Sequence, residues 1–202
     1  GLNDVVIEIG ITPNRQDCLG VFGIARDLAA SGLGKLKIRK NSSQKGSFKS
    51  PIDIETKNTN LCPIFAGRYF KGVKNVQSPD WLQQKLKSVG LRPISALVDI
   101  TNFVMLDLNR PLHVYDADKI DGKIIVRESK EGESFNALDE KSYDLKDGMC
   151  AIADERKVLG LGGIMGGESS GCNESTENVI LESALFNPIN IAKSGRNLSI
   201  LS

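Results

Sequence analysis

The only histidine of the sequence, His113, lies in the segment RPLHVYDAD, so any chemistry that needs an imidazole must use this side chain. A catalytic triad would also need an activated serine or cysteine, and we expect neither a hydrolase-type nucleophile elbow nor a reactive cysteine here. One histidine cannot provide ordinary two-histidine metal ligation. The context alone therefore favours a packed or capping role for His113, and turn-capping roles for Asp116 and Asp118.

The segment GLGGIMGGESSG, residues 160–171, could form a ligand-binding loop, because six of its twelve residues are glycine. It fails the dinucleotide fingerprint, since Met165 stands where the third glycine of G-x-G-x-x-G belongs. It also fails the P-loop pattern, since Glu168 follows two glycines where a lysine is required. We therefore predict that the glycines serve a tight turn, for which Gly166 and Gly167 are the better candidates, or a close approach of the backbone to a ligand.

Glu182 is the third candidate, because it interrupts the almost wholly apolar run NVILESAL. Such a run predicts a strand that is buried on both faces. A buried carboxylate is costly unless something donates a hydrogen bond to it. Two hypotheses remain open at this point: the partner is an arginine or a set of backbone amides, or the donor arrives with a ligand.

The composition is that of a soluble globular protein, with 40% hydrophobic and 25% charged residues among 202. The 26 basic and 25 acidic side chains leave a net charge of +1, which gives no electrostatic signature of nucleic-acid or membrane binding. No apolar run reaches the length of a membrane span. The four cysteines are far apart and form no C-x-x-C pair, so we expect reduced thiols rather than zinc or disulfides.

Residues 1–34 are predicted to contain a strand at 5–9, a turn at 12–14 and a helix that Asp17 caps and Gly32 ends. The following residues, 35–50, hold six basic groups, no acid and a serine-rich centre. We interpret them as a solvated basic linker and place a domain boundary there.

The second part of the chain, residues 51–202, begins with helices and continues with strands. Ser78 and Pro79 are predicted to start a helix that ends at Gly90, with Trp81, Leu82 and Leu86 facing inward. A second helix is predicted over residues 94–108, and a last one starts at Asn187 and Pro188. Short strands are predicted between them, at 123–128, 133–138, 149–154, 157–163 and 178–185. This order of helices followed by strands predicts the α+β class.

Three long segments together resemble the beta subunit of bacterial phenylalanyl-tRNA synthetase: EIGITPNRQDCLGVFGIARDLAA, LRPISALVDITNFVMLDLNRPLHVYDADKI and LGLGGIMGGESSGCNESTENVILESALFNPINI. They cover nearly the whole chain in the order of that family. The resemblance implies a B3/B4-type domain over residues 51–202, with layered sheets of mixed topology flanked by helices and a truncated C-terminal end. It implies that residues 1–34 are the tail of a smaller, B1-like α/β domain.

The resemblance further implies an editing module, which hydrolyses tyrosine wrongly attached to phenylalanine tRNA, within an enzyme that attaches phenylalanine to that tRNA. Catalytic roles fall on His113 and Thr101. Glu182 would recognise the hydroxyl of tyrosine, and no metal is implied. The other residues of the implied substrate pocket are Arg92, Pro111, Leu138, Gly162, Gly163 and Ser202, the last in place of the usual threonine.

The implied partners are the 3′ end of phenylalanine tRNA and a synthetase alpha subunit in an (αβ)2 assembly, in the cytoplasm and away from membranes. ATP and magnesium are implied for the intact synthetase, and no cofactor for this chain. The alternative is a structural or interaction domain that packs against the alpha subunit without activity of its own. A free-standing RNA-binding protein is a third hypothesis, which the near-neutral charge disfavours.

Overall fold

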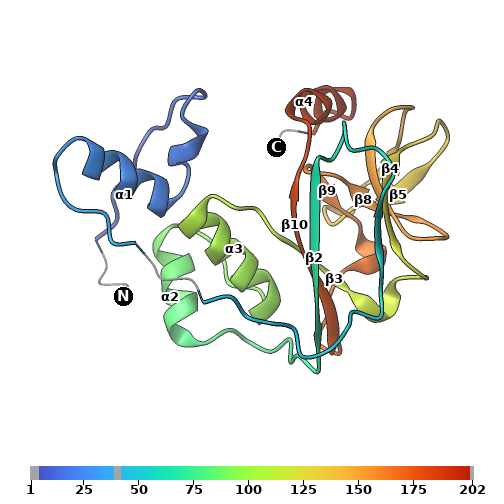
Figure 1. The fold of residues 1–202 in the computed structure, drawn as a ribbon, viewed down its shortest axis with the longest axis horizontal. Helices are drawn as coiled ribbons and strands as arrows, with labels where there is room; N and C mark the ends of the chain where they lie inside the picture. Colours follow the sequence, from blue (N-terminus) through green and yellow to red (C-terminus); the bar gives the residue numbers. More distant parts are fainter. Residues whose placement is uncertain (1–4, 39–41, 201–202) are drawn as a thin grey trace. The chain divides into compact units, whose positions relative to one another are not determined.

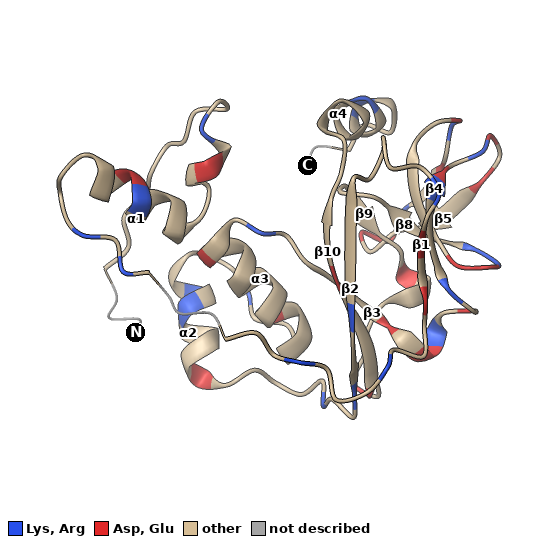
Figure 2. Cartoon of the chain, in the orientation of Figure 1, with Lys and Arg blue, Asp and Glu red and all other residues tan. Residues whose placement is uncertain are grey.

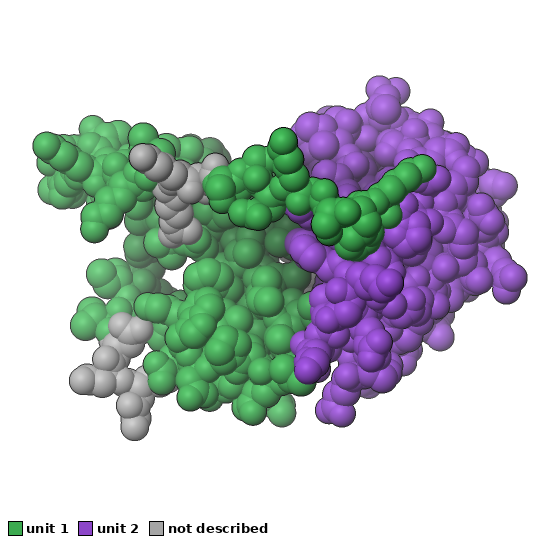
Figure 3. Space-filling model, turned by 60° about the horizontal axis from the view of Figure 1, so that its bottom comes forward, with its two compact units in different colours: residues 1–49, 76–112 green, residues 50–75, 113–202 purple. Residues whose placement is uncertain are grey.

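The computed structural model describes residues 5–38 and 42–200 and divides them into two compact units (Figure 3). Unit 1 comprises the described parts of residues 1–49 together with 76–112, and unit 2 comprises residues 50–75 and 113–200. The chain thus enters unit 2 twice, whereas the predicted division into residues 1–34, 35–50 and 51–202 follows the order of the sequence.

Unit 1 contains three α-helices among its described residues, α1 (Val21–Ala30), α2 (Asp80–Ser88) and α3 (Ala96–Leu108), and a 3₁₀ helix at Gln16–Cys18. The strand predicted at residues 5–9 is wrong, because this segment pairs with no strand among the described residues and its apolar side chains are exposed. Asp17 does not cap α1, whose N-cap is Gly20. Its carboxylate instead pairs with Arg15 at 3.0 Å and Arg26 at 2.6 Å.

The start of helix α2 lies close to the predicted one, but Ser78 and Pro79 have different roles from those predicted. The helix begins one residue after Pro79, which is itself the N-cap, and the hydroxyl of Ser78 donates to the Asp99 carboxylate instead of capping. Leu82 is buried as predicted, whereas Trp81 is 56% exposed and its predicted inward orientation is wrong. Its ring packs edge-to-face on Phe103 with centroids 5.5 Å apart.

Unit 2 is built on three sheets (Figure 1). The five-stranded sheet has the order β1-β4-β7-β8-β9, and β1 runs parallel to β4 while the other pairs are antiparallel. The three-stranded antiparallel sheet has the order β2-β10-β3, and β5 and β6 form a separate hairpin. The strands are β1 (Ile54–Thr56), β2 (Ile64–Lys71), β3 (His113–Asp116), β4 (Ile124–Glu128), β5 (Ser134–Asn136), β6 (Ser142–Asp144), β7 (Cys150–Ala153), β8 (Val158–Leu161), β9 (Met165–Gly166) and β10 (Asn178–Leu185).

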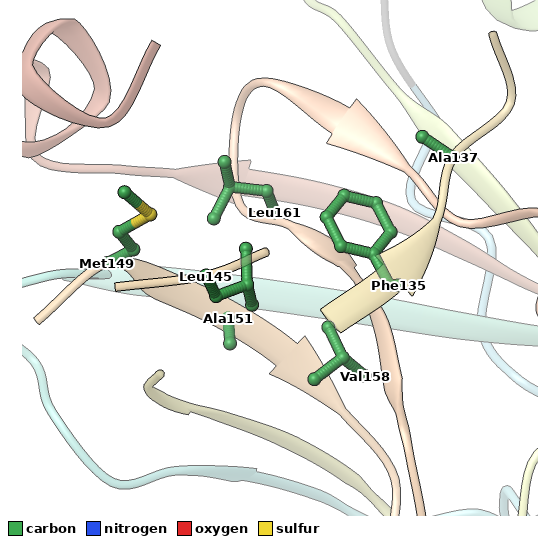
Figure 4. Packing of buried hydrophobic residues seen from close by; sticks show 7 residues of the cluster. All are labelled: Phe135, Ala137, Leu145, Met149, Ala151, Val158 and Leu161. Carbon is green, nitrogen blue, oxygen red and sulfur yellow. The ribbon is translucent and has the colours of Figure 1, made fainter. Parts of the chain in front are cut away.

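The five-stranded sheet is covered on both faces by apolar side chains. One cluster joins it to the β5–β6 hairpin and contains Phe135, Leu145, Ala151 and Leu161 (Figure 4). The other joins it to the three-stranded sheet and contains Tyr115, Ile124, Ile152, Leu159 and Ile180. Burial on both faces explains why β7 reads Cys-Ala-Ile-Ala with no polar residue.

The C-terminal helix α4 (Pro188–Asn197) confirms its predicted start. The Asn187 side chain accepts hydrogen bonds from the amides of Ile189 (2.9 Å) and Asn190 (3.1 Å), and Pro188 occupies the first turn. Asn190 in turn accepts from the Cys150 amide at 3.2 Å, which ties α4 to β7.

The capping role predicted for Asp116 is also confirmed, since its carboxylate accepts from the Asp118 amide at the start of the 3₁₀ helix Ala117–Lys119. Acidic and basic residues are interspersed along the loops around β4 and β5 (Figure 2). No helix among the described residues is both long and apolar enough to span a membrane. In the part of the chain that the structure describes, four α-helices and sheets of mixed topology confirm the predicted α+β class.

Candidate functional site

The register of the three-stranded sheet brings Glu182 and His113 together. The two residues are directly opposite each other in the β10–β3 pair, and Ile180 is opposite Tyr115. Opposite residues of an antiparallel pair share a face of the sheet, and residues two apart on one strand share it too. Glu182, His113 and Tyr115 therefore project from one face, where Tyr115 and Ile180 pack into the core beside the five-stranded sheet.

Among the described residues, the carboxylate of Glu182 has one hydrogen-bond donor. The hydroxyl of Tyr115 donates to Glu182 Oε2 at 2.5 Å, and both side chains are buried, at 1% and 6% exposure. The partner is thus a tyrosine, rather than the arginine or backbone amides considered from the sequence. The other oxygen, Oε1, makes no hydrogen bond to a residue that the structure describes.

Burial sets the charge state of this carboxylate. It raises the pKa of Glu182 to about 7, against the opposing effect of the hydrogen bond from Tyr115. Burial and the neighbouring Glu182 charge also raise the pKa of the Cys62 thiol to about 11. Burial, the neighbouring Cys62 thiol and the Glu182 charge raise the pKa of the Cys150 thiol to about 12. The carboxylate therefore titrates near neutral pH among groups that stay uncharged.

His113 is held against the ring of Tyr115, with centroids 4.4 Å apart and an interplanar angle of 71°. Its Nε2 is buried and has no hydrogen-bond partner among the described residues. Burial lowers the pKa of His113 to about 4, so the imidazole is neutral at pH 7. A neutral ring with a free nitrogen can orient a water molecule or accept a proton, but it is no imidazolium acid at this pH.

The backbone of β9 lies directly beside this imidazole. A Cβ on Gly166 would stand 2.3 Å from His113 Cε1 and 3.1 Å from Leu138 Cδ1, so only glycine allows the observed packing. The Leu138 amide also donates to the Gly166 carbonyl at 3.0 Å. The structure thereby gathers His113, Gly166 and the half-exposed Leu138.

The glycine-rich segment forms its turn at Gly162, Gly163 and Ile164, rather than at Gly166 and Gly167. Gly163 has a φ of +70°, which favours glycine. A Cβ on Gly162 would lie 2.7 Å from the Phe186 ring and 2.9 Å from Cys150 Sγ. Because side chains of the chain itself fill the space around these glycines, the segment does not cradle a phosphate. The wall role of Gly162 and Gly163 stays a prediction.

Three of the predicted site residues belong to unit 1. Arg92 is exposed in the connection between α2 and α3, and Pro111 lies in the connection after α3. Thr101 lies on α3, where its hydroxyl donates to the Val98 carbonyl at 2.8 Å. Ser202 lies outside the described residues. The roles of these four residues stay predictions.

Sequence reasoning does not single out Tyr115 as a site residue, and it predicts a turn at Gly166 rather than a position beside His113. Tyr115 stands two residues after His113, and an alternating strand pattern in HVYD would have placed both on one face. A G-x-S-x-G pattern also occurs at residues 167–171, but it forms the 3₁₀ helix Glu168–Ser170 after a two-residue strand and is no strand-to-helix nucleophile elbow. Among the described residues, no group of three His, Cys, Asp or Glu could hold a metal ion.

Residues 61–202 match the sequence profile of the B3/4 domain. The phenylalanine–tRNA ligase beta subunit of Bradyrhizobium diazoefficiens is 55% identical over 201 residues, which are 100% of this chain and 25% of that protein. The same subunit of Rhodopseudomonas palustris is 54% identical over 200 residues, or 99% of this chain and 25% of that protein. The chain spans about a quarter of the length of these curated relatives.

A solved structure, an N-terminal fragment of the phenylalanyl-tRNA synthetase beta subunit from Pyrococcus horikoshii, has a similar fold. The TM-score is 0.52 at 15% sequence identity, with 90% of this chain and 59% of that chain covered. At this level of identity the likeness concerns the fold alone.

Proposed function

The chain belongs to the B3/4 domain family, and we propose that it is an editing module that hydrolyses the ester between tyrosine and phenylalanine tRNA. The observation that carries this proposal is the buried carboxylate of Glu182, with one oxygen held by Tyr115 and the other without a donor among the described residues. The names of the relatives support a synthetase context for the module.

Glu182 can distinguish tyrosine from phenylalanine because only tyrosine has a hydroxyl on its ring. The aminoacylation pocket of a synthetase that accepts phenylalanine excludes tyrosine only weakly, because an apolar pocket cannot strongly reject an added hydroxyl. A second pocket with a buried acceptor reverses the preference. Tyrosine donates to Glu182, whereas phenylalanine leaves the buried acceptor unpaired, which costs about 1–3 kcal/mol. This difference corresponds to a preference of about tenfold to a hundredfold.

Hydrolysis of an aminoacyl ester needs a positioned water more than a strong nucleophile, because the ester is already activated. The water oxygen attacks the ester carbonyl carbon, the bond to the ribose oxygen breaks, and that oxygen leaves with a proton. The neutral His113, with its free Nε2, would orient the water or the terminal ribose. We assign the second catalytic position to Thr101 and the remaining pocket wall to Arg92, Pro111, Leu138, Gly162, Gly163 and Ser202.

The rest of the reaction takes place outside this chain in our proposal. ATP and magnesium serve the attachment of phenylalanine elsewhere in a cytoplasmic synthetase, together with an alpha subunit in an (αβ)2 assembly. The glycine-rich turn of this chain is filled by side chains such as Phe186 and is unsuited to a nucleotide phosphate. The substrate that reaches this module is the 3′ end of mischarged phenylalanine tRNA.

The proposal is tested by deacylation of tyrosyl- and phenylalanyl-tRNA(Phe) with the 202-residue chain and its Glu182→Ala variant. We expect faster hydrolysis of the tyrosyl ester, and a loss of that preference by about tenfold to a hundredfold in the variant. If the folded wild type hydrolyses neither ester but binds the alpha subunit, the interaction-domain alternative is correct. Equal hydrolysis of both esters would contradict the specificity role of Glu182.

A further inference from the structure

The Glu182 carboxylate is surrounded by side chains that stay uncharged at pH 7. The groups that face it are Tyr115 and His113 from β3, Cys150 from β7 and Cys62 from the segment before β2. The Cys62 thiol donates to the Ile64 carbonyl, and His113 is neutral at pH 7. Of these groups, Tyr115 alone donates a hydrogen bond to Glu182.

Tyr115 is a rigid donor. Its side chain is 1% exposed, it packs in the cluster between the two sheets, and its ring contacts His113 edge-to-face. A tyrosine so enclosed cannot move away without opening the core. Its hydroxyl therefore fixes the position of Oε2, and with it the orientation of the whole planar carboxyl group.

We propose that Tyr115 is the positioning residue of the tyrosine-selective site: its hydroxyl occupies Oε2 of Glu182 and directs Oε1 at the hydroxyl of the bound tyrosyl group. This inference rests on the proposed function and adds the residue that makes the carboxylate selective. Specificity then belongs to the Glu182–Tyr115 pair, in which the bound tyrosine supplies the second donor to an acceptor that can take several.

The hydroxyl of Tyr115 also affects the charge of Glu182, because its hydrogen bond lowers the pKa of the carboxyl group. Burial favours the protonated acid, and the donated hydrogen bond favours the carboxylate. Without the hydroxyl the balance moves toward the protonated acid, which is a weaker acceptor for a phenol than a carboxylate. Tyr115→Phe keeps the ring that supports His113, so it should weaken tyrosine binding and leave the hydrolytic step nearly unchanged.

The first measurement follows the ionisation of Glu182 directly, by NMR titration of glutamate side chains labelled with ¹³C at the carboxyl. The Glu182 signal is the one that Glu182→Gln removes. We expect a midpoint near pH 7 in the wild type and an upward shift of about one unit in Tyr115→Phe. Tyr143→Phe is the matched control, because it removes another tyrosine–carboxylate hydrogen bond, 2.7 Å to Asp139, and should leave the Glu182 midpoint unchanged. An unchanged midpoint in Tyr115→Phe would overturn the inference.

The second measurement compares the affinities of L-tyrosine and L-phenylalanine by calorimetry at neutral and alkaline pH. In Tyr115→Phe we expect about a tenfold loss of tyrosine affinity at neutral pH, no change for phenylalanine, and partial recovery at alkaline pH as the acid ionises. The KM for tyrosyl-tRNA should rise by a similar factor while kcat stays close to the wild-type value. An equal loss for both amino acids would mean a merely structural role and would overturn the inference.

The outcomes separate this inference from the proposed function. If Glu182→Ala keeps the tyrosine preference, the proposed function fails, whatever Tyr115→Phe does. If Glu182→Ala removes the preference and Tyr115→Phe keeps it, the inference alone fails. If Tyr115→Phe does not fold, 3-fluorotyrosine at position 115 replaces it: the more acidic hydroxyl should lower the Glu182 midpoint, and an unchanged midpoint would contradict the inference.

Discussion

Two regions of unit 2 contain the same hydrogen bond in opposite surroundings. Between β3 and β10, buried Tyr115 donates to Glu182 at 2.5 Å. In the β5–β6 hairpin, Tyr143 donates to Asp139 at 2.7 Å in contact with solvent. The pKa of Glu182 is raised to about 7 because burial outweighs the hydrogen bond, whereas the pKa of Asp139 is lowered because the hydrogen bond from Tyr143 outweighs burial.

The difference shows that the environment, rather than the hydrogen bond, decides what a tyrosine–carboxylate pair does. Asp139 has further partners in its own turn, the Lys141 amide at 3.3 Å and the Lys141 ammonium at 3.7 Å, so its pair supports a local turn. Glu182 has no second donor among the described residues, so its carboxylate can accept another hydrogen bond.

Glu182→Gln should change the pH dependence of stability most. The pKa of Glu182 rises from 4.5 in the unfolded chain to about 7 in the folded one, so the folded state holds the proton more tightly. Stability therefore falls as pH rises from 4.5 to 7, by up to about 3 kcal/mol. The variant lacks this loss, and its advantage over the wild type should grow across that range. Denaturant unfolding at each pH checks this, and a constant difference would contradict the raised pKa.

His113 should give the free energy of unfolding a pH dependence opposite to that of Glu182, and His113→Gln should remove this contribution. The pKa of His113 falls from 6.5 to about 4 on folding, so its contribution is complete above pH 6.5 and is lost as pH falls toward 4, by up to about 3 kcal/mol. In the wild type, as pH falls from 6.5 to 4.5, the stability lost through His113 offsets the stability gained through Glu182. We expect His113→Gln to gain stability on acidification in that window, where Glu182→Gln loses it. Parallel profiles of the two variants would refute this cancellation.

His113→Gln should also lower deacylation of tyrosyl-tRNA at neutral pH, beyond what its effect on stability accounts for. Single-turnover hydrolysis, with unfolding measured in the same buffer, separates the two effects. A large loss of stability with unchanged residual activity would support a purely packed histidine.

Gly166→Ala should displace the imidazole, because the new Cβ would stand 2.3 Å from His113 Cε1. We expect a loss of about 1–3 kcal/mol in the free energy of unfolding, together with slower deacylation. Gly34→Ala is the control, since no atom lies within 4 Å of its Cβ position and its φ is not positive. Equal stability and equal deacylation rates in the two variants would show that β9 shifts to accommodate the new Cβ and does not fix the position of His113.

Tyr143→Phe should have the smallest effect. Because the folded-state pKa of Asp139 is lowered, its contribution is present above the unfolded pKa of 3.8 and is lost as pH falls through the folded value. We expect a small loss of stability at neutral pH that vanishes in acid, with tyrosine preference unchanged. A change in preference would break the contrast between the two pairs.

Local signals in the sequence predicted much of this fold. Asn187 and Pro188 start α4, Gly90 ends α2 with a φ of +83°, and the apolar run around Glu182 is a strand. The run around Glu182 is a strand, but only Val179, Ile180 and Glu182 of it are buried, so the predicted burial on both faces is wrong for the rest. The helix ends and the strand itself depend on neighbours along the chain, so composition and spacing reveal them.

Features that depend on distant partners were missed or wrong. Tyr115 and Glu182 are 67 residues apart, and only the β3–β10 register brings them together. The apolar segment 5–9 has a strand composition but no strand partner among the described residues, and Trp81 packs on Phe103 at the surface. Register and partner availability are tertiary properties, which periodicity cannot supply.

Recognition of the tyrosine hydroxyl by ionised Glu182 can be measured as the calorimetric affinities of L-tyrosine and L-phenylalanine for the chain across pH 5.5 to 8.5. We predict a tyrosine preference of about tenfold to a hundredfold above neutral pH, which declines below pH 7 as the carboxylate is protonated, and a small, pH-independent preference in Glu182→Gln. A wild-type preference that stays constant across this range, or a pH dependence that survives in Glu182→Gln, would show that the ionised carboxylate does not recognise the hydroxyl.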